Sequence, residues 1–143
     1  MTTESRWVML CSPVFWAALT VLVINDHVLK GSGALPGWLT GKLSDFAGLV
    51  VAPLTLIALS GARRPAARLA CLAAVAAAFA AIKLASEPAR LVEDLSRRVG
   101  LGWRICSDPT DLFAFAVLPL SWRLSLDFAH DAAALCIRSS AWA

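Results

Sequence analysis

Long apolar runs alternate with short polar segments along this chain. Four apolar runs cover residues 7–25, 45–62, 67–86 and 110–126. A helix needs about 20 mostly apolar residues to cross the hydrocarbon core of a bilayer, and each run approaches that length. The fourth run crosses only if Arg123 extends its side chain to the interface. The pattern predicts an all-α integral membrane bundle of four transmembrane helices, one domain over 1–143, with a three-span bundle and a re-entrant fourth segment as the alternative.

Proline interrupts three of these runs, at Pro13, Pro53 and Pro119. A proline lacks the backbone N–H that would bond the carbonyl four residues earlier. A membrane helix tolerates this when a neighbouring helix, or a hydroxyl such as that of Thr55, satisfies the freed carbonyl. Pro13 falls in the first two turns of its run, and a kink is expected at Pro119. The third run is rich in alanine, which favours close packing of helices in lipid.

The segment between the third and fourth runs has a different pattern. Leu91, Val92, Leu95 and Val99 recur at helical spacing among charged residues. This predicts a short amphipathic helix over about 88–100 on the membrane surface, acting either as a lid or as a connecting element. The tail, 127–143, is also amphipathic and is expected on the same kind of surface.

Composition places the chain in the membrane class and narrows its partners. Of 143 residues, 59% are hydrophobic and 16% are charged, against about a quarter charged in soluble domains, and the mean hydropathy is +0.70. The net charge of +3 reflects loop and interface residues, so no nucleic-acid partner is expected. The four cysteines show no CxxC or metal-binding spacing. The basic loop at 63–68 favours both termini in the cytoplasm.

Three polar segments flank the apolar runs: NDHVLK at 25–30, TGKLSDFAGL at 40–49 and SDPTDL at 107–112. In a four-span topology the end of the first span, the start of the second, the end of the third and the start of the fourth share one side. We therefore expect these polar residues to converge on one face, and we regard them as candidate binding residues. They are Asp26, His27, Lys30, Lys42, Ser44, Asp45, Lys83, Asp108 and Asp111.

Each of these segments also has a purely structural interpretation. Asp26 and Lys30 lie on one helical face, where they pair, hold an anion, or simply end a helix in the head groups. Ser44 or Asp45 is suited to N-cap the second span, although Asp45 is expected to pair with a lysine, and Lys83 to extend to the interface. The partners considered for Asp45 are Lys42, Lys30 and Lys83.

The segment SDPTDL reads as a helix start. Ser107 or Asp108 caps, Pro109 suits the first helical position, and Asp111 is favourable near the positive end of the helix dipole. These carboxylates also permit a metal-site hypothesis. Together with Asp26, Asp45 and His27 they would surround a divalent cation, with the carboxylates as hard oxygen ligands.

Two classes of function remain open. One is a binding protein whose polar face holds a lipid head group, an envelope-linked ligand or a partner protein. The other is a metal-assisted membrane enzyme acting on a lipid-linked phosphate through Asp45, Asp108 and Asp111. The binding class is favoured because no nucleophile–base pair and no HExxH or GxSxG motif is present. An enzyme requires carboxylates converging on one ion, whereas a structural network requires each to be paired with Lys30, Lys42 or Lys83. Cofactor, substrate and oligomeric state are not specified by the sequence.

The string WLTGKLSDFAGL, with NDHVLKG upstream and DPTDL downstream, resembles a family of small bacterial polytopic membrane proteins. More distantly, the layout resembles VanZ-like proteins, which place a charged pair and an aromatic residue at the head of one span and acidic residues at the head of a later one. Lys42, Asp45 and Phe46 match the first element, and Asp108 and Asp111 the second. Phe46 stands where VanZ-like proteins usually carry histidine. The resemblance implies a multi-pass protein of the bacterial inner (cytoplasmic) membrane with a cell-envelope role.

Overall fold

The computed structural model describes residues 7–30, 32–98, 100 and 108–126, and its regular elements are all helical. In chain order they are the 3-10 helix η2 (Val8–Cys11), α1 (Pro13–Ile24), the π-helical turn η3 (Asn25–Leu29), α2 (Gly37–Ser60), α3 (Pro65–Leu84), α4 (Ser86–Arg98) and the 3-10 helix η4 (Pro109–Val117). An α-helical stretch, 118–126, follows η4 directly. The all-α prediction is confirmed over these residues, and the tail 127–143 lies outside them.

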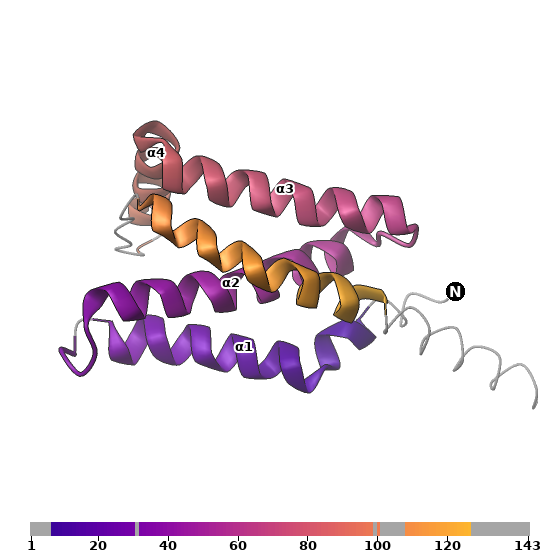
Figure 1. The fold of residues 1–143 in the computed structure, drawn as a ribbon, viewed down its shortest axis with the longest axis horizontal. Helices are drawn as coiled ribbons and strands as arrows, with labels where there is room; N and C mark the ends of the chain where they lie inside the picture. Colours follow the sequence, from indigo (N-terminus) through magenta and orange to yellow (C-terminus); the bar gives the residue numbers. More distant parts are fainter. Residues whose placement is uncertain (1–6, 31, 99, 101–107, 127–143) are drawn as a thin grey trace, which may run out of the picture.

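The helices form an up-and-down bundle with α2 at its centre. Helices α1, α2 and α3 and the segment 109–126 run along one another, while α4 lies across one end (Figure 1). The buried core joins Phe15 of α1 and Leu72 of α3 to a row of residues on α2. That row consists of Val50, Leu54, Ile57 and Ala58. Val117, Trp122 and Leu124 pack against this core, so the last segment completes the bundle.

Helices α2 and α3 are long and apolar enough to cross a membrane. At 1.5 Å per residue they extend about 36 and 30 Å, against a hydrocarbon core of about 30 Å. Only 39% of the most apolar window of α2 and 11% of that of α3 is buried within the protein. A core helix of a soluble protein would be mostly buried, whereas here large apolar residues such as Leu59, Leu69 and Phe113 are exposed. Pro13–Leu29 is a shorter apolar helix.

The first predicted run, 7–25, is not one continuous helix. It breaks at Ser12, whose Oγ accepts a hydrogen bond from the backbone N–H of Val14 at 3.2 Å. Pro13 is the first residue of α1, where no N–H is needed. The helix then continues past residue 25 as a π turn, closed by the bond from Lys30 N–H to the Asn25 carbonyl at 2.8 Å.

The prediction that Ser44 or Asp45 caps the second span is wrong. Helix α2 begins at Gly37, eight residues before the predicted start at 45, so both residues lie inside the helix. Its other end is where the sequence indicates it: Gly61 has a left-handed φ of 64°, a conformation that favours glycine, and Pro65 opens α3.

Pro53 lies in the middle of α2 and leaves the carbonyl of Leu49 without its helical donor. The hydroxyl of Ser121, from the last segment, donates to that carbonyl at 2.9 Å, which confirms that a neighbouring helix satisfies it. Pro119 is handled differently. The N–H of Leu118 bonds the carbonyl of Phe115, so the 3-10 geometry of η4 satisfies the group that Pro119 frees. Pro119 thus lies where the helix changes from 3-10 to α-helical geometry.

Candidate functional site: a paired polar network at one end of the bundle

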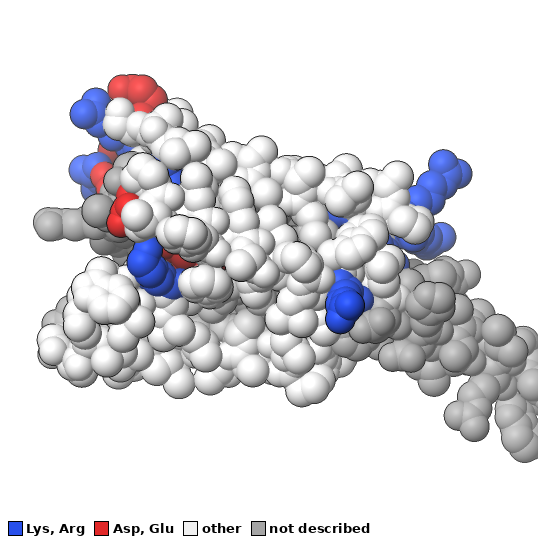
Figure 2. Space-filling model, in the orientation of Figure 1, with Lys and Arg blue, Asp and Glu red and all other residues white. Residues whose placement is uncertain are grey.

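The carboxyl groups of the described residues lie at one end of the bundle. This end, hereafter the carboxylate end, is formed by η3, the start of α2, the end of α3, α4 and the start of η4. In Figure 2 the acidic side chains lie at the end where α4 is, and an uncharged band covers the middle of the bundle. The residues are Asp26, Asp45, Glu87, Glu93, Asp94, Asp108 and Asp111. The convergence expected from a four-span topology is therefore present in the fold.

Lys83 is the centre of the network. Its ammonium group donates to Asp45 Oδ2 at 2.8 Å and to Asp111 Oδ2 at 2.6 Å. The three side chains come from α3, α2 and η4 and are only 9–12% exposed. Lys83 is one of the three lysines considered as partners of Asp45, and this pairing is confirmed, but the side chain is buried and does not extend outward as expected. Two buried carboxylates need a cation between them, and this interaction turns the side chain inward.

Lys42 completes the charge balance of this cluster. Its Nζ donates to Thr110 Oγ1 at 2.8 Å and to Asp111 Oδ1 at 3.2 Å. Two lysines and two aspartates therefore sum to zero formal charge. On the apolar side, the Lys83 ammonium lies 5.5 Å from the ring centroid of Phe79, within the range of a cation–π contact. Only Lys42, at 29% exposure, reaches the surface appreciably.

A second cluster joins η3 to α2. Asn25 is fully buried, and its Nδ2 donates to the Thr40 carbonyl at 2.7 Å and to Ser44 Oγ at 2.6 Å. The Ser44 hydroxyl donates to Asp26 Oδ1 at 2.6 Å, and Lys30 Nζ donates to the same oxygen at 2.8 Å. Within the described part of the chain, Asn25 Oδ1 is a buried acceptor without a hydrogen-bond donor.

The remaining candidate residues have simpler roles. Asp108 accepts a bond from the Thr110 N–H at 2.8 Å and so caps η4, as the sequence indicates. His27 is exposed, and its side chain has no hydrogen bond or ion pair with any residue that the structure describes. Glu87, outside the candidate set, lies in the first turn of α4 and forms an exposed pair with Arg90 at 3.5 Å.

The carboxylates do not form the oxygen cage of the metal hypothesis. Among residues 7–30, 32–98, 100 and 108–126, no group of three or more His, Cys, Asp or Glu side chains is placed to hold a metal ion. The ammonium of Lys83 already lies between Asp45 and Asp111, where a bridging cation would have to bind. Asp26 is engaged by Lys30 and Ser44, and Asp108 by backbone. Asp26, Asp45 and Asp111 are each paired with a lysine, as the structural network requires, whereas Asp108 caps a helix instead.

Sequence reasoning missed the polar residues that hold the clusters together, namely Asn25, Thr40 and Thr110. The available signal was spacing: Thr40 precedes Ser44 by one helical turn, and Thr110 precedes Asp111. The donor role of Asn25 depends on a contact between residues 15 to 19 positions apart, which no local pattern specifies.

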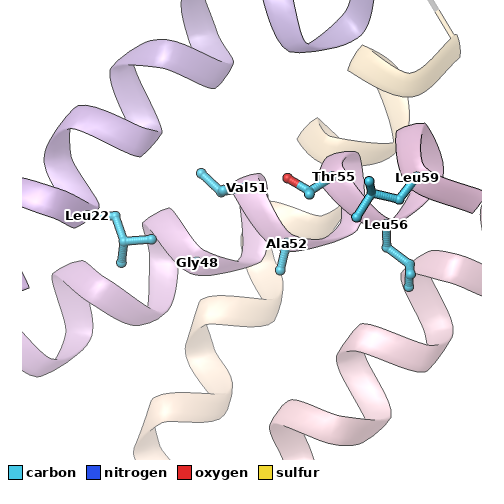
Figure 3. A pocket seen from close by; sticks show the side chains of 7 residues that line it. All are labelled: Leu22, Gly48, Val51, Ala52, Thr55, Leu56 and Leu59. Carbon is cyan, nitrogen blue, oxygen red and sulfur yellow. The ribbon is translucent and has the colours of Figure 1, made fainter. Parts of the chain in front are cut away.

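An apolar groove begins beside the second cluster. Its volume is about 400 Å³, and its lining is almost entirely apolar. It is lined by Leu22 of α1 and by Gly48, Val51, Ala52, Thr55, Leu56 and Leu59 of α2 (Figure 3). Gly48 lies one turn beyond Ser44, and Leu22 lies three residues before Asn25. The groove therefore starts at the polar cluster and continues along α2 toward the opposite end.

Comparisons of the chain with protein-family models, curated proteins and solved structures found no match. The interpretation of the site therefore rests on its geometry, and the resemblance to VanZ-like proteins stays a prediction.

Proposed function

We propose that this chain is a four-span protein of the bacterial inner membrane, with both termini in the cytoplasm, that binds a zwitterionic phospholipid at its carboxylate end. The support for four spans is that Pro13–Leu29 and the segment 109–126 run beside the two long apolar helices (Figure 1). Exposed tryptophans near both ends of the bundle, Trp7 and Trp38, suit two membrane interfaces.

The continuity of the groove with the polar cluster carries this proposal. A phospholipid needs a polar site for its head group and an apolar surface for an acyl chain, in that order along the membrane normal. Lys30, 43% exposed, and Lys42, 29% exposed, are the accessible cations for a phosphate. Asp108, which has no lysine partner among the described residues, offers a carboxylate to the ammonium of the same head group. The groove from Gly48 to Leu59 then accepts one acyl chain.

The charge pairing favours binding over catalysis. Asp45 and Asp111 are held by Lys83, and Asp26 by Lys30, so none of these carboxylates is free to act as a general base. A network with zero formal charge also matches a zwitterion better than an ion of either sign. The site therefore supports recognition of a head group rather than turnover of it.

Native mass spectrometry of the protein in mild detergent with added phosphatidylethanolamine tests this function. Gly48→Leu should abolish the lipid adduct. A Cβ built at Gly48 has no other atom within 4 Å, so a leucine side chain fits there without a clash and would fill the groove. Ala77→Leu, an exposed position on α3, is the matched control and should keep the adduct. Lys30→Gln should weaken the adduct by removing a phosphate ligand. Equal adducts in the two leucine variants would rule out the groove as the lipid site.

A further inference from the structure

The end of the bundle opposite the carboxylates is organised by a buried arginine. Arg68, in the first turn of α3, is only 4% exposed. Its Nε donates to the Ala62 carbonyl at 3.1 Å, and its Nη1 donates to the Ser125 carbonyl. This side chain therefore connects the loop 61–64 to the last helical stretch, 118–126. We name this region, with the start of α3, the arginine end.

The contacts of Arg68 bring three exposed guanidinium groups to one end. Arg63 and Arg64 follow Ala62 in the loop, and Arg123 lies two residues before Ser125. None of the three has an ion-pair partner in the described part of the chain, because all seven described carboxylates lie at the other end. In Figure 2 basic side chains are visible at this end, and the acidic side chains that can be seen lie at the opposite end.

Helix α4 provides an internal contrast. It also carries three arginines, Arg90, Arg97 and Arg98. Arg90 pairs with Glu87 at 3.5 Å, and Arg97 pairs with Asp94 at 2.9 Å. Among the described residues, Arg90 and Arg97 of α4 are thus paired with carboxylates, whereas Arg63, Arg64 and Arg123 are not.

We propose that the arginine end binds anionic phospholipids through Arg63, Arg64 and Arg123. Guanidinium groups bind phosphate oxygens in a bidentate manner, and basic residues next to a span attract anionic head groups. The partner is a lipid rather than a free anion, because these arginines flank the ends of α2 and α3, where head groups of a surrounding bilayer would lie. This site is separate from the zwitterion site, since it lies at the other end of the spans and requires negative charge.

The test uses vesicles of equimolar phosphatidylcholine and phosphatidylglycerol. After reconstitution and extraction in mild detergent, native mass spectrometry gives the ratio of the two retained lipids. We expect wild type to enrich phosphatidylglycerol, and R63Q/R64Q/R123Q to lose that enrichment by roughly tenfold or more. R90Q/R97Q/R98Q removes the same formal charge and should keep it. Salt of about 1 M, where the Debye length is about 3 Å, should reduce the wild-type ratio.

Two further variants keep the test decisive. R63K/R64K/R123K retains the charge and should retain most of the enrichment. R63Q/R64Q, with both changes in the loop, should lose part of the phosphatidylglycerol enrichment. This variant replaces R63Q/R64Q/R123Q in the test if circular dichroism shows that the triple variant unfolds. The proposal is overturned if wild type shows no enrichment, or if the two triple glutamine variants behave alike. Loss of phosphatidylethanolamine binding in Gly48→Leu with normal phosphatidylglycerol enrichment would show that the two sites are independent.

Discussion

The two ends of this bundle place charge next to long apolar helices by different means. At the carboxylate end, buried Lys83 is held by the side chains of Asp45 and Asp111. At the arginine end, buried Arg68 is held by two backbone carbonyls and by no carboxylate in the described part of the chain. The first arrangement is closed, because its charges cancel. Among the described residues, the second has no carboxylate that cancels its positive charge, and the exposed Arg63, Arg64 and Arg123 add to that charge.

This difference shows what decides whether the charges at one end of the bundle stabilise the fold or remain available to bind a ligand. Burying a charge is costly unless it is paired, so the cluster around Lys83 mainly holds three helices together. An arginine cannot lose its proton, and its five donors can be satisfied by carbonyls while its charge remains. The comparison suggests that mutations at the carboxylate end should affect stability most, and mutations at the arginine end should affect lipid selectivity most.

The largest expected effect is that of Lys83→Met. The variant leaves Asp45 and Asp111 facing each other without their shared cation, and breaking a buried pair costs about 3–5 kcal/mol. Unfolding titrations in mixed micelles would measure the loss. The variant K83M/D45N/D111N removes all three charges and should recover most of it. If Lys83→Met lowered the free energy of unfolding no more than a typical surface substitution does, the network would not be what holds the helices together.

Arg68→Met comes next in size. It leaves the carbonyls of Ala62 and Ser125 without a donor, and hydrogen bonds to charged groups are worth about 1.5–3 kcal/mol. The same unfolding titration gives the value. Arg64→Met, in the exposed loop, is the control and should change stability little. If the two substitutions had equal effects, the connecting role of Arg68 would be wrong.

Ser121→Ala should cost about 1 kcal/mol, because it leaves the carbonyl of Leu49 unsatisfied opposite Pro53. A double-mutant cycle isolates this contact. In a Pro53→Ala background the helix supplies its own donor to Leu49, so the cost of Ser121→Ala should nearly vanish. Identical costs in both backgrounds would mean that the hydroxyl acts in some other way.

The smallest effect is expected at the Asp26–Lys30 pair, which is 27% and 43% exposed. Exposed pairs four residues apart on a helix contribute about 0.3–0.5 kcal/mol, and Lys30→Met should cost no more than that in unfolding experiments. Lipid binding should respond more strongly than stability does. A stability loss approaching that of Lys83→Met would remove the distinction between the buried pairs of Lys83 and the more exposed Asp26–Lys30 pair.

The convergence of the polar segments was predictable from the alternation of apolar and polar runs, and so was the cap at Asp108. The start of α2 was not. The stretch around Gly37 and Gly41 precedes the predicted start at 45, yet it is helical, and Asn25 from another element bonds the Thr40 carbonyl and Ser44 there. Tertiary contacts of this kind override local propensity.

The direction in which the charged side chains point was equally unpredictable from the sequence. Lys83 lies one residue before the end of α3, a position where lysine usually extends to the interface. Its inward direction depends on Asp111, which is 28 residues away, and on Asp45, which is 38 residues away. Arg68 belongs to a cluster that reads as exposed charge in a short loop, and only the fold shows that it is buried.

The central claim is that the two charged ends face opposite sides of a membrane, with the arginine end in the cytoplasm. Single cysteines at Ala34, beside the carboxylate end, and at Ala66, at the arginine end, would test it in a variant whose native cysteines are replaced by serine. Both positions are exposed in the fold. A membrane-impermeant maleimide applied to intact spheroplasts should label the cysteine at 34, and should label that at 66 only after permeabilisation. Labelling of both positions from the same side would contradict a membrane-spanning bundle with these two ends.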